Sequence, residues 1–241
     1  MVPFGDREGL CCLCLSLCPS GSSCPSLLNS HPAMSRLPPI AESAAADKVA
    51  QTYERLREMF EGQPIPGPFL RYGHVPAFLQ DTYMNFKKFV WSEGTLDVPA
   101  KTLVAIAVAG TLRCGEWLDV LTARARQVGL PEAQVSEALA VAASCQMYNV
   151  FFKFRELSGS ELFSGMSVGL RAHTFAGTSL DPKLVELINI AVSDINGCKP
   201  CTSGHVEKAR HLGVSDEAML ECIQCASTMA AACAFVNAAN A

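Results

Sequence analysis

The sequence has few charged residues, few aromatic residues and no long run of consecutive apolar residues. Its 19 lysine and arginine residues are outnumbered by 23 aspartate and glutamate residues, which gives a formal net charge of −4. Surfaces that bind nucleic acid or anionic membranes need clustered basic side chains, so this balance argues against both kinds of partner. Apolar stretches such as residues 103–109 and 187–192 are far shorter than the ~20 residues that span a bilayer. We therefore expect a globular protein without a transmembrane segment, whose partners are small molecules or other proteins.

The alternation of polar and apolar residues that marks a half-buried strand is almost absent after residue 44. Apolar residues recur instead at helical spacing, with proline and glycine at the joints. The predicted fold class is therefore all-α. The expected helices span residues 43–60, 76–91, 99–111, 116–128, 131–157, 181–194, 200–212 and 215–237.

The N-terminal segment differs in composition from the remainder of the chain. It is rich in serine, proline and cysteine and lacks any helical or strand period. Residues 9–18 faintly resemble the apolar region of a signal peptide, but the basic flank and the small-residue cleavage site are missing. We expect residues 1–36 to be a disordered extension, or the product of a start codon upstream of a true start at Met34. The folded domain is expected to span residues 37–241.

Twelve cysteines suggest a disulfide framework, but that inference applies to short secreted chains. Five of them crowd the first 24 residues, whereas the other seven lie within expected helices or at their starts. The second group suits a reducing compartment, where a free cysteine acts as a small buried apolar residue. We expect a cytoplasmic protein.

The chain contains an internal repeat of a three-helix unit. A shift of 84 residues places Cys114 on Cys198 and Gly129 on Gly213, and it defines units of about 96–155 and 180–239. Features required by the fold should appear in both copies, whereas features that serve chemistry can appear in one. Three chemical groups occur only in the second copy: Glu186, Cys201 and His205 are replaced in the first by Thr102, Trp117 and Leu121.

The pair Cys198 and Cys201 lies at the expected start of a helix. Proline is tolerated in the first turn of a helix but not in its interior, so Pro200 indicates that the helix begins at or just before this residue. Cys201 is then in the first turn, where free backbone N–H groups, the helix dipole and Lys199 stabilise a thiolate. We expect its pKa to fall below the usual ~8.5, as a nucleophile requires.

Two further residues complete the predicted catalytic site. His205 lies one helical turn after Cys201 on the same face, where it can accept the thiol proton or hold a water that relays it. Glu186 is the lone charge in an apolar stretch, and a carboxylate in such surroundings must be hydrogen-bonded or protonated. Cys198, just outside the helix, has the usual separation for closing a disulfide on a neighbouring sulfenic acid.

Other interpretations of these residues stay open at this point. Cys198, Cys201 and His205 could bind zinc with Glu186 as a fourth ligand, since a structural zinc site needs four. A thioredoxin-like site needs a βαβ context that the helical pattern does not supply. A second pair, Cys222 and Cys225, lies in the middle of an expected helix and is interpreted as two core residues.

The residues resemble those of the AhpD-like alkylhydroperoxidases, within the carboxymuconolactone decarboxylase superfamily. The resemblance covers about residue 44 to the C-terminus and is strongest in MYNVFFKFRELSG (147–159) and ELINIAVSDINGCKPCTSGH (186–205). It implies an all-helical fold with duplicated halves, assembly into homo-oligomers such as trimers, and reduction of organic hydroperoxides without a metal or other cofactor. It also implies a dithiol reductant on a lipoyl-bearing partner protein, in some systems with a peroxiredoxin.

Transferred by position, the resemblance implies that Cys201 attacks the peroxide, Cys198 resolves the sulfenic acid, and Glu186 and His205 form the proton relay. The chain departs from the family at Pro200, where well-characterised members have a histidine that contributes to the relay. The departure puts the reaction rate and the identity of the electron donor in question, rather than the thiol chemistry. The competing hypothesis is a non-catalytic protein of the same superfamily that senses oxidation through this disulfide or serves in assembly.

Overall fold

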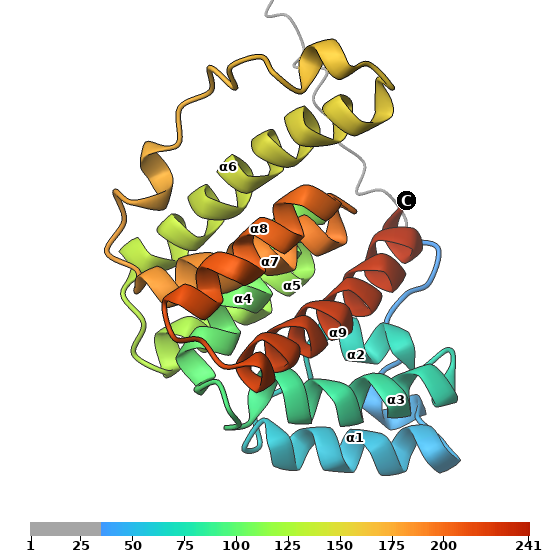
Figure 1. The fold of residues 1–241 in the computed structure, drawn as a ribbon. Coiled ribbons are helices and arrows are strands. Elements are labelled where there is room, and N and C mark those ends of the chain that lie inside the picture. Colours follow the sequence, from blue (N-terminus) through green and yellow to red (C-terminus); the bar gives the residue numbers. More distant parts are fainter. Residues whose placement is uncertain (1–34) are drawn as a thin grey trace, which may run out of the picture. The chain divides into compact units, whose positions relative to one another are not determined.

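Helices form all the regular secondary structure in the computed structural model, which describes residues 35–241 (Figure 1). The all-α prediction is confirmed. The expected disordered or mis-started extension lies almost wholly outside the described residues. Within them, the backbone N–H of Arg36 donates to the carbonyl of Ala239 over 2.8 Å, so the chain near residue 36 packs beside the end of the last helix. The longer helices are α1 (Asp47–Met59), α3 (Pro76–Phe86), α4 (Val98–Thr111), α5 (Gly115–Gln127), α6 (Glu132–Leu157), α7 (Pro182–Ile195), α8 (Lys199–His211) and α9 (Asp216–Asn240).

The second half of the fold repeats the helix boundaries of the preceding one. A shift of 84 residues places both ends of α4 on α7 and both ends of α5 on α8. It also places the start of α6 on the start of α9. These boundaries agree with the predicted three-helix units.

Local signals in the sequence account for these boundaries. Asp97 and Asp181 cap α4 and α7, because their carboxylates accept hydrogen bonds from backbone N–H groups of the first turn over 2.8 Å. Gly129 and Gly213 follow α5 and α8 with φ values of +75° and +79°, a conformation that glycine adopts without strain.

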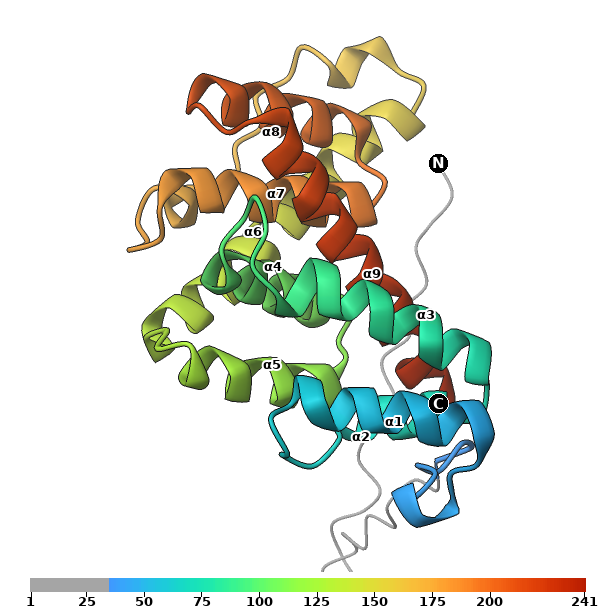
Figure 2. The same ribbon diagram turned by 90° about the horizontal axis from the view of Figure 1, so that it is seen from below.

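The centre of the fold is the pair α4 and α7. Residues 101–109 of α4 and 185–193 of α7 are all buried. Helices α6 and α9 pack against both central helices, while α5 and α8 each form a hairpin with the central helix that precedes them. Figures 1 and 2 show that α9 extends from one end of the fold to the other. Helices α6, α7 and α8 lie at one end, and the N-terminal helices lie at the other. This arrangement buries one face of α7 against α6 and α8, where the predicted site lies.

The N-terminal helices supply an aromatic cluster to the first unit. The short helix α2 (Gly67–Tyr72), which the sequence did not predict, and α3 bring Phe69, Tyr72 and Phe86 against Trp117 of α5. Trp117 is fully buried, and its indole N–H donates to the hydroxyl of Tyr72 over 2.8 Å. The helix expected over 76–91 is α3 followed directly by a π-helical turn, Lys87–Trp91.

Helix α9 is long and apolar enough to cross a membrane, although the sequence predicts no transmembrane segment. Among the described residues it is the one helix that meets both criteria. In this fold it packs against α2, α3, α4 and α7, and it buries residues such as Cys222, Met229 and Val236. Helix α9 is therefore a core helix here, and its alanine and cysteine side chains allow close approach of its neighbours.

Candidate functional site

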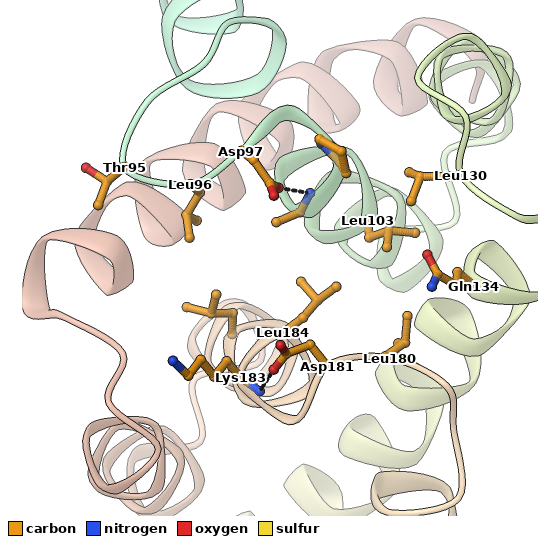
Figure 3. A pocket seen from close by; sticks show the side chains of 13 residues that line it. Thr95, Leu96, Asp97, Leu103, Leu130, Gln134, Leu180, Asp181, Lys183 and Leu184 are labelled. Carbon is orange, nitrogen blue, oxygen red and sulfur yellow. Dashed lines mark hydrogen bonds between the residues drawn. The ribbon is translucent and has the colours of Figure 1, made fainter.

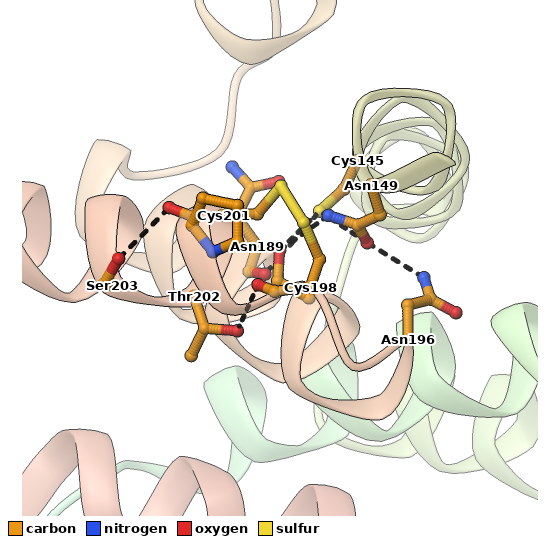
Figure 4. Close-up of a disulfide and its surroundings, with 10 residues drawn as sticks. Cys145, Asn149, Asn189, Asn196, Cys198, Cys201, Thr202 and Ser203 are labelled. Atoms are coloured by element: carbon orange, nitrogen blue, oxygen red, sulfur yellow. Dashed lines mark hydrogen bonds between the residues drawn. A yellow bond between two sulfur atoms is a disulfide. The ribbon is translucent and has the colours of Figure 1, made fainter. Parts of the chain in front are cut away.

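The start of α8 places the two predicted thiols. Cys198 is the residue before the helix, and Pro200 lies in the first turn, as the sequence predicts. Cys198 and Cys201 form a disulfide, with their Cα atoms 5.4 Å apart (Figure 4). Cys198 is fully buried and Cys201 keeps 8% of its surface exposed. Of the two sulfur-bearing residues, Cys201 is thus the one that solvent reaches.

The first unit has the same backbone at this position but different chemistry. Cys114 precedes α5 with φ −95° and ψ 92°, and Cys198 precedes α8 with φ −95° and ψ 88°. The position of Cys201, however, is occupied in the first unit by Trp117, which lies in the aromatic cluster. The fold therefore requires the turn and the small residue before the helix, while the second thiol is particular to the second unit.

Glu186 is buried and bonded to two residues of α8. Only 1% of the residue is exposed, although it lies in the middle of α7. Its Oε2 lies 2.7 Å from Nδ1 of His205, and its Oε1 accepts a hydrogen bond from Nζ of Lys208 over 2.6 Å. The expectation that this carboxylate is buried and hydrogen-bonded is confirmed.

These contacts determine the direction in which the pKa of Glu186 shifts. Burial raises the pKa of a carboxyl group, because the charged form loses its hydration. The hydrogen bonds from His205 and Lys208, together with their charges, act in the opposite direction and lower the pKa of Glu186 below its ordinary value of 4.5. Glu186 is therefore ionised at neutral pH and can orient the His205 ring and stabilise its protonated form.

The loop between α6 and α7 covers His205. This segment passes along the outer side of α6 and α7 and contains the short 3₁₀ helix η4 (His173–Phe175) (Figure 1). The ring of Phe175 contacts the His205 ring edge-on, with 6.4 Å between the ring centroids. Phe175 thus restricts access of water to the relay from that side.

A cluster of buried polar residues, which the sequence did not predict, lies near the disulfide. The thiol of Cys145 on α6 lies 3.2 Å from the hydroxyl of Ser193, which accepts a hydrogen bond from the amide of Asn149 over 3.0 Å. The amide oxygen of Asn149 in turn accepts from Asn196 over 2.9 Å (Figure 4). These bonds hold the α7–α8 turn against α6.

Lys208 is a further site residue that sequence reasoning missed. It lies three residues after His205, on the face of α8 that meets α7. The fold was still needed to show that Glu186 reaches both residues.

The second CxxC pair has the predicted character of two core residues. Cys222 and Cys225 are both fully buried and not bonded to each other. Their thiols donate to the backbone carbonyls of Leu187 and Lys101. Burial raises the pKa of Cys225 to about 12 and that of Cys222 well above its ordinary value. Neither thiol is a nucleophile at neutral pH.

The structure provides three cavities of interest in the described part of the chain. One of about 350 Å³ lies between the starts of α4 and α7, where Leu96 and Leu180 and the capping residues Asp97 and Asp181 line it (Figure 3). It does not reach the thiols. Two others flank the start of α8: one of about 390 Å³ is lined in part by Cys198, and one of about 420 Å³ lies between Pro200 and the end of α6.

Similarity to known proteins agrees with this geometry. The model of the carboxymuconolactone decarboxylase family matches residues 78–156 and 163–241, which fall in the two halves of the fold. The chain belongs to the carboxymuconolactone decarboxylase family. Within this family, it is similar to proteins named alkyl hydroperoxide reductase AhpD, so the resemblance inferred from the sequence is confirmed.

Three of these relatives give the extent of the similarity. The protein of Acidobacterium capsulatum is 31% identical over 170 residues, which cover 68% of this chain and 89% of the relative. The protein of Solibacter usitatus is 37% identical over 156 residues, 64% of this chain and 86% of the relative. The protein of Koribacter versatilis is 31% identical over 156 residues, 64% of this chain and 79% of the relative.

Proposed function

We propose that the chain is a thiol peroxidase that reduces organic hydroperoxides by cycling between a dithiol and the Cys198–Cys201 disulfide. The observation that carries the proposal is the disulfide at the start of α8, beside a buried carboxylate bonded to His205. The names of its AhpD relatives support the same reaction class.

The first chemical step is attack by the Cys201 thiolate on the peroxide. Cys201 lies in the first turn of α8, where backbone N–H groups and the helix dipole stabilise its thiolate. The thiolate sulfur forms a bond to one peroxide oxygen as the O–O bond breaks, and the alkoxide leaves with the electron pair. His205, held by Glu186, protonates the alkoxide. The products are an alcohol and the sulfenic acid of Cys201.

The second step closes the disulfide. The thiolate of Cys198 attacks the sulfur of the Cys201 sulfenic acid, the S–O bond breaks, and the hydroxide that leaves takes a proton to form water. An external dithiol must then reduce the disulfide. We propose a dihydrolipoyl group on a partner protein as this reductant, with a peroxiredoxin as a further partner, in a cytoplasmic setting.

We also propose that the protein works as a homo-oligomer, a trimer or a multiple of it. An exposed apolar stripe on α6 supports this assembly, because its members recur every three or four residues and so lie on one face. A second copy of the chain is the proposed partner of this surface. The stripe, which we call the α6 stripe, consists of Met147, Val150, Phe154 and Leu157, with exposed fractions of 39%, 62%, 50% and 83%.

Peroxide consumption tests the proposal. Reduced protein is mixed with cumene hydroperoxide in a stopped-flow instrument, and loss of peroxide and formation of the disulfide are followed together. Cys201→Ser is expected to abolish turnover. Cys114→Ser is the matched control, because Cys114 occupies the equivalent helix start in the first unit and serine caps helices well.

If the wild-type protein neither consumes peroxide nor forms the disulfide, the peroxidase proposal fails. Disulfide formation with an oxidant but without catalytic consumption of peroxide would favour the redox-sensing alternative.

A further inference from the structure

Asn189 is a buried polar residue whose side chain has no hydrogen-bond partner within residues 35–241. It lies on α7, and none of its surface is exposed. Both Oδ1 and Nδ2 are unpaired, although the backbone carbonyl of Asn189 accepts a hydrogen bond from Cys145. Buried amides in native proteins nearly always have partners, because burial without them is costly. The amide of Asn189 is therefore free to bind a group that residues 35–241 do not supply.

The pairing between α7 and α8 shows which group lies opposite Asn189. The two helices run antiparallel from a short turn. Next to the turn, the backbone N–H of Cys198 donates to the carbonyl of Ser193 over 2.9 Å. Farther from the turn, Glu186 binds His205. These two contacts define the register of the hairpin.

In this register Asn189 lies opposite Cys201. Asn189 comes three residues after Glu186 on α7, and Cys201 comes four residues before His205 on α8, so each lies one helical turn closer to the connecting turn. Figure 4 shows Asn189 beside the disulfide.

We propose that Asn189 binds the reacting atoms of Cys201. Its Nδ2–H donates to the thiolate sulfur in the reduced protein, and its amide then binds the oxygen that this sulfur gains from the peroxide. The oxygen-binding part rests on the proposed peroxidase function.

The chemistry of the cycle explains why both amide atoms are unpaired in the disulfide state. The sulfenic acid group, S–O–H, has an oxygen that accepts and a hydroxyl that donates, and these match Nδ2 and Oδ1 of one amide. When Cys198 attacks the sulfur, the S–O bond breaks and the oxygen leaves as hydroxide, which becomes water. The amide of Asn189 then loses its partner, and the disulfide has no charged sulfur to replace it.

The fold itself does not need this amide. Glu186 and Ser193, on the same face of α7, have partners on α8 and α6, whereas Asn189 contributes no side-chain hydrogen bond. Asn189→Leu keeps the size and removes the unpaired groups, so the disulfide form should be as stable as wild type or more stable.

The experiment compares Asn189→Leu with the parent in a Cys198→Ser background, where the sulfenic acid of Cys201 accumulates. Reduced protein is mixed with cumene hydroperoxide, and sulfenic acid formation is followed with a sulfenic-acid-specific reagent. We expect Asn189→Leu to slow this step about 100- to 1,000-fold, as loss of one preorganised donor does elsewhere. The melting temperature of the disulfide form, measured without Cys198→Ser, should stay the same or rise.

Alkylation of Cys201 by iodoacetamide at neutral pH provides a readout that needs no peroxidase activity. Asn189→Leu should slow it several-fold, because the thiolate loses a donor. Asn189→Asp replaces the donor by a negative charge and should slow the alkylation of Cys201 further. This variant takes the place of Asn189→Leu if the leucine variant does not fold. If the wild-type protein does not react with peroxide but alkylation of Cys201 is slower in the variants, the peroxidase proposal fails. The proposed contact between Asn189 and the Cys201 thiolate then still stands. Equal alkylation and sulfenic acid formation in all variants would overturn the role of Asn189.

Discussion

Oε2 of Glu186 on α7 lies 2.7 Å from Nδ1 of His205 on α8, one helical turn from Cys201. This contact fixes the orientation of the imidazole ring. It also leaves Nε2, the other ring nitrogen, without a protein partner among residues 35–241, so that nitrogen is free to exchange a proton with the reacting groups.

Glu186→Gln should reduce peroxide turnover about 100-fold, because the amide keeps the shape but cannot stabilise a protonated His205. The rate is measured with reduced protein and cumene hydroperoxide. Glu221→Gln is the matched control, since Glu221 is also bonded to a lysine, Lys101, over 2.7 Å but lies outside the site. A loss of turnover in the control that equals the loss in Glu186→Gln would point to a general effect on the fold.

The pH dependence of stability should also depend on Glu186. Its pKa in the folded protein is below the ordinary value of 4.5, because the hydrogen bonds from His205 and Lys208 outweigh the effect of burial. The stabilisation that results is present above the unfolded pKa and is lost as the pH falls through the folded pKa. Urea unfolding at a series of acidic pH values should therefore show a shallower loss of stability for Glu186→Gln than for wild type. Parallel curves would mean that this carboxylate is not stabilised in the fold.

Thiol reactivity should follow exposure more than pKa. The neighbouring Cys233 thiol lowers the pKa of Cys114 below its ordinary value, but Cys114 is fully buried. Iodoacetamide treatment of the reduced native protein, followed by peptide mass spectrometry, should label Cys201 before the other cysteines of residues 35–241 and leave Cys114, Cys222 and Cys225 unlabelled. Early labelling of Cys114 would show that the first unit opens readily.

Trp117 and Cys201 occupy equivalent positions and should have opposite roles. Trp117→Ala removes a buried ring from the aromatic cluster and should lower the free energy of unfolding by about 3–5 kcal/mol. Cys201→Ala should change the stability of the reduced protein far less but abolish turnover. Denaturant unfolding and the peroxide assay together separate these effects. A large stability loss in both variants would contradict the division between a structural first unit and a chemical second unit.

The α6 stripe predicts an oligomer. Val150→Glu adds a charge to a position that is 62% exposed in a single chain, so it should not affect folding of the monomer. It should, however, disrupt a contact between copies, and light scattering after size-exclusion chromatography should show a smaller particle than wild type. Ala133→Glu, on the exposed N-terminal turn of the same helix, serves as the control. An unchanged mass for Val150→Glu would place the interface elsewhere.

Most helix boundaries could be predicted because the local signals are strong and occur twice. Asp97 and Asp181, Gly129 and Gly213 mark the same joints in both units, and the alternating pattern of strands is almost absent after residue 44. Helix α2 was missed because it is short and begins within the proline- and glycine-rich stretch 62–68, where tertiary packing of Phe69 decides the conformation.

The four predicted site residues could be singled out in the sequence because they are unusual in their surroundings. Glu186 stands alone in an apolar stretch, and the two thiols and His205 follow a proline that marks a helix start. Lys208 and Asn189 could not be identified in the same way. A lysine on a helix is most often solvated, and Asn189 is one polar residue among apolar ones. Their roles depend on the register between α7 and α8, which only the folded structure provides.

The most direct test of the account is the mass of the peptide that carries Cys198 and Cys201 after a single exposure of the reduced protein to one equivalent of organic hydroperoxide. In the wild type we expect this peptide to lose two hydrogen atoms as the disulfide forms, and in Cys198→Ser we expect Cys201 to gain one oxygen atom. An unchanged peptide in both proteins, or an oxygen on Cys198 in Cys201→Ser at the wild-type rate, would contradict the assignment of Cys201 as the attacking thiol.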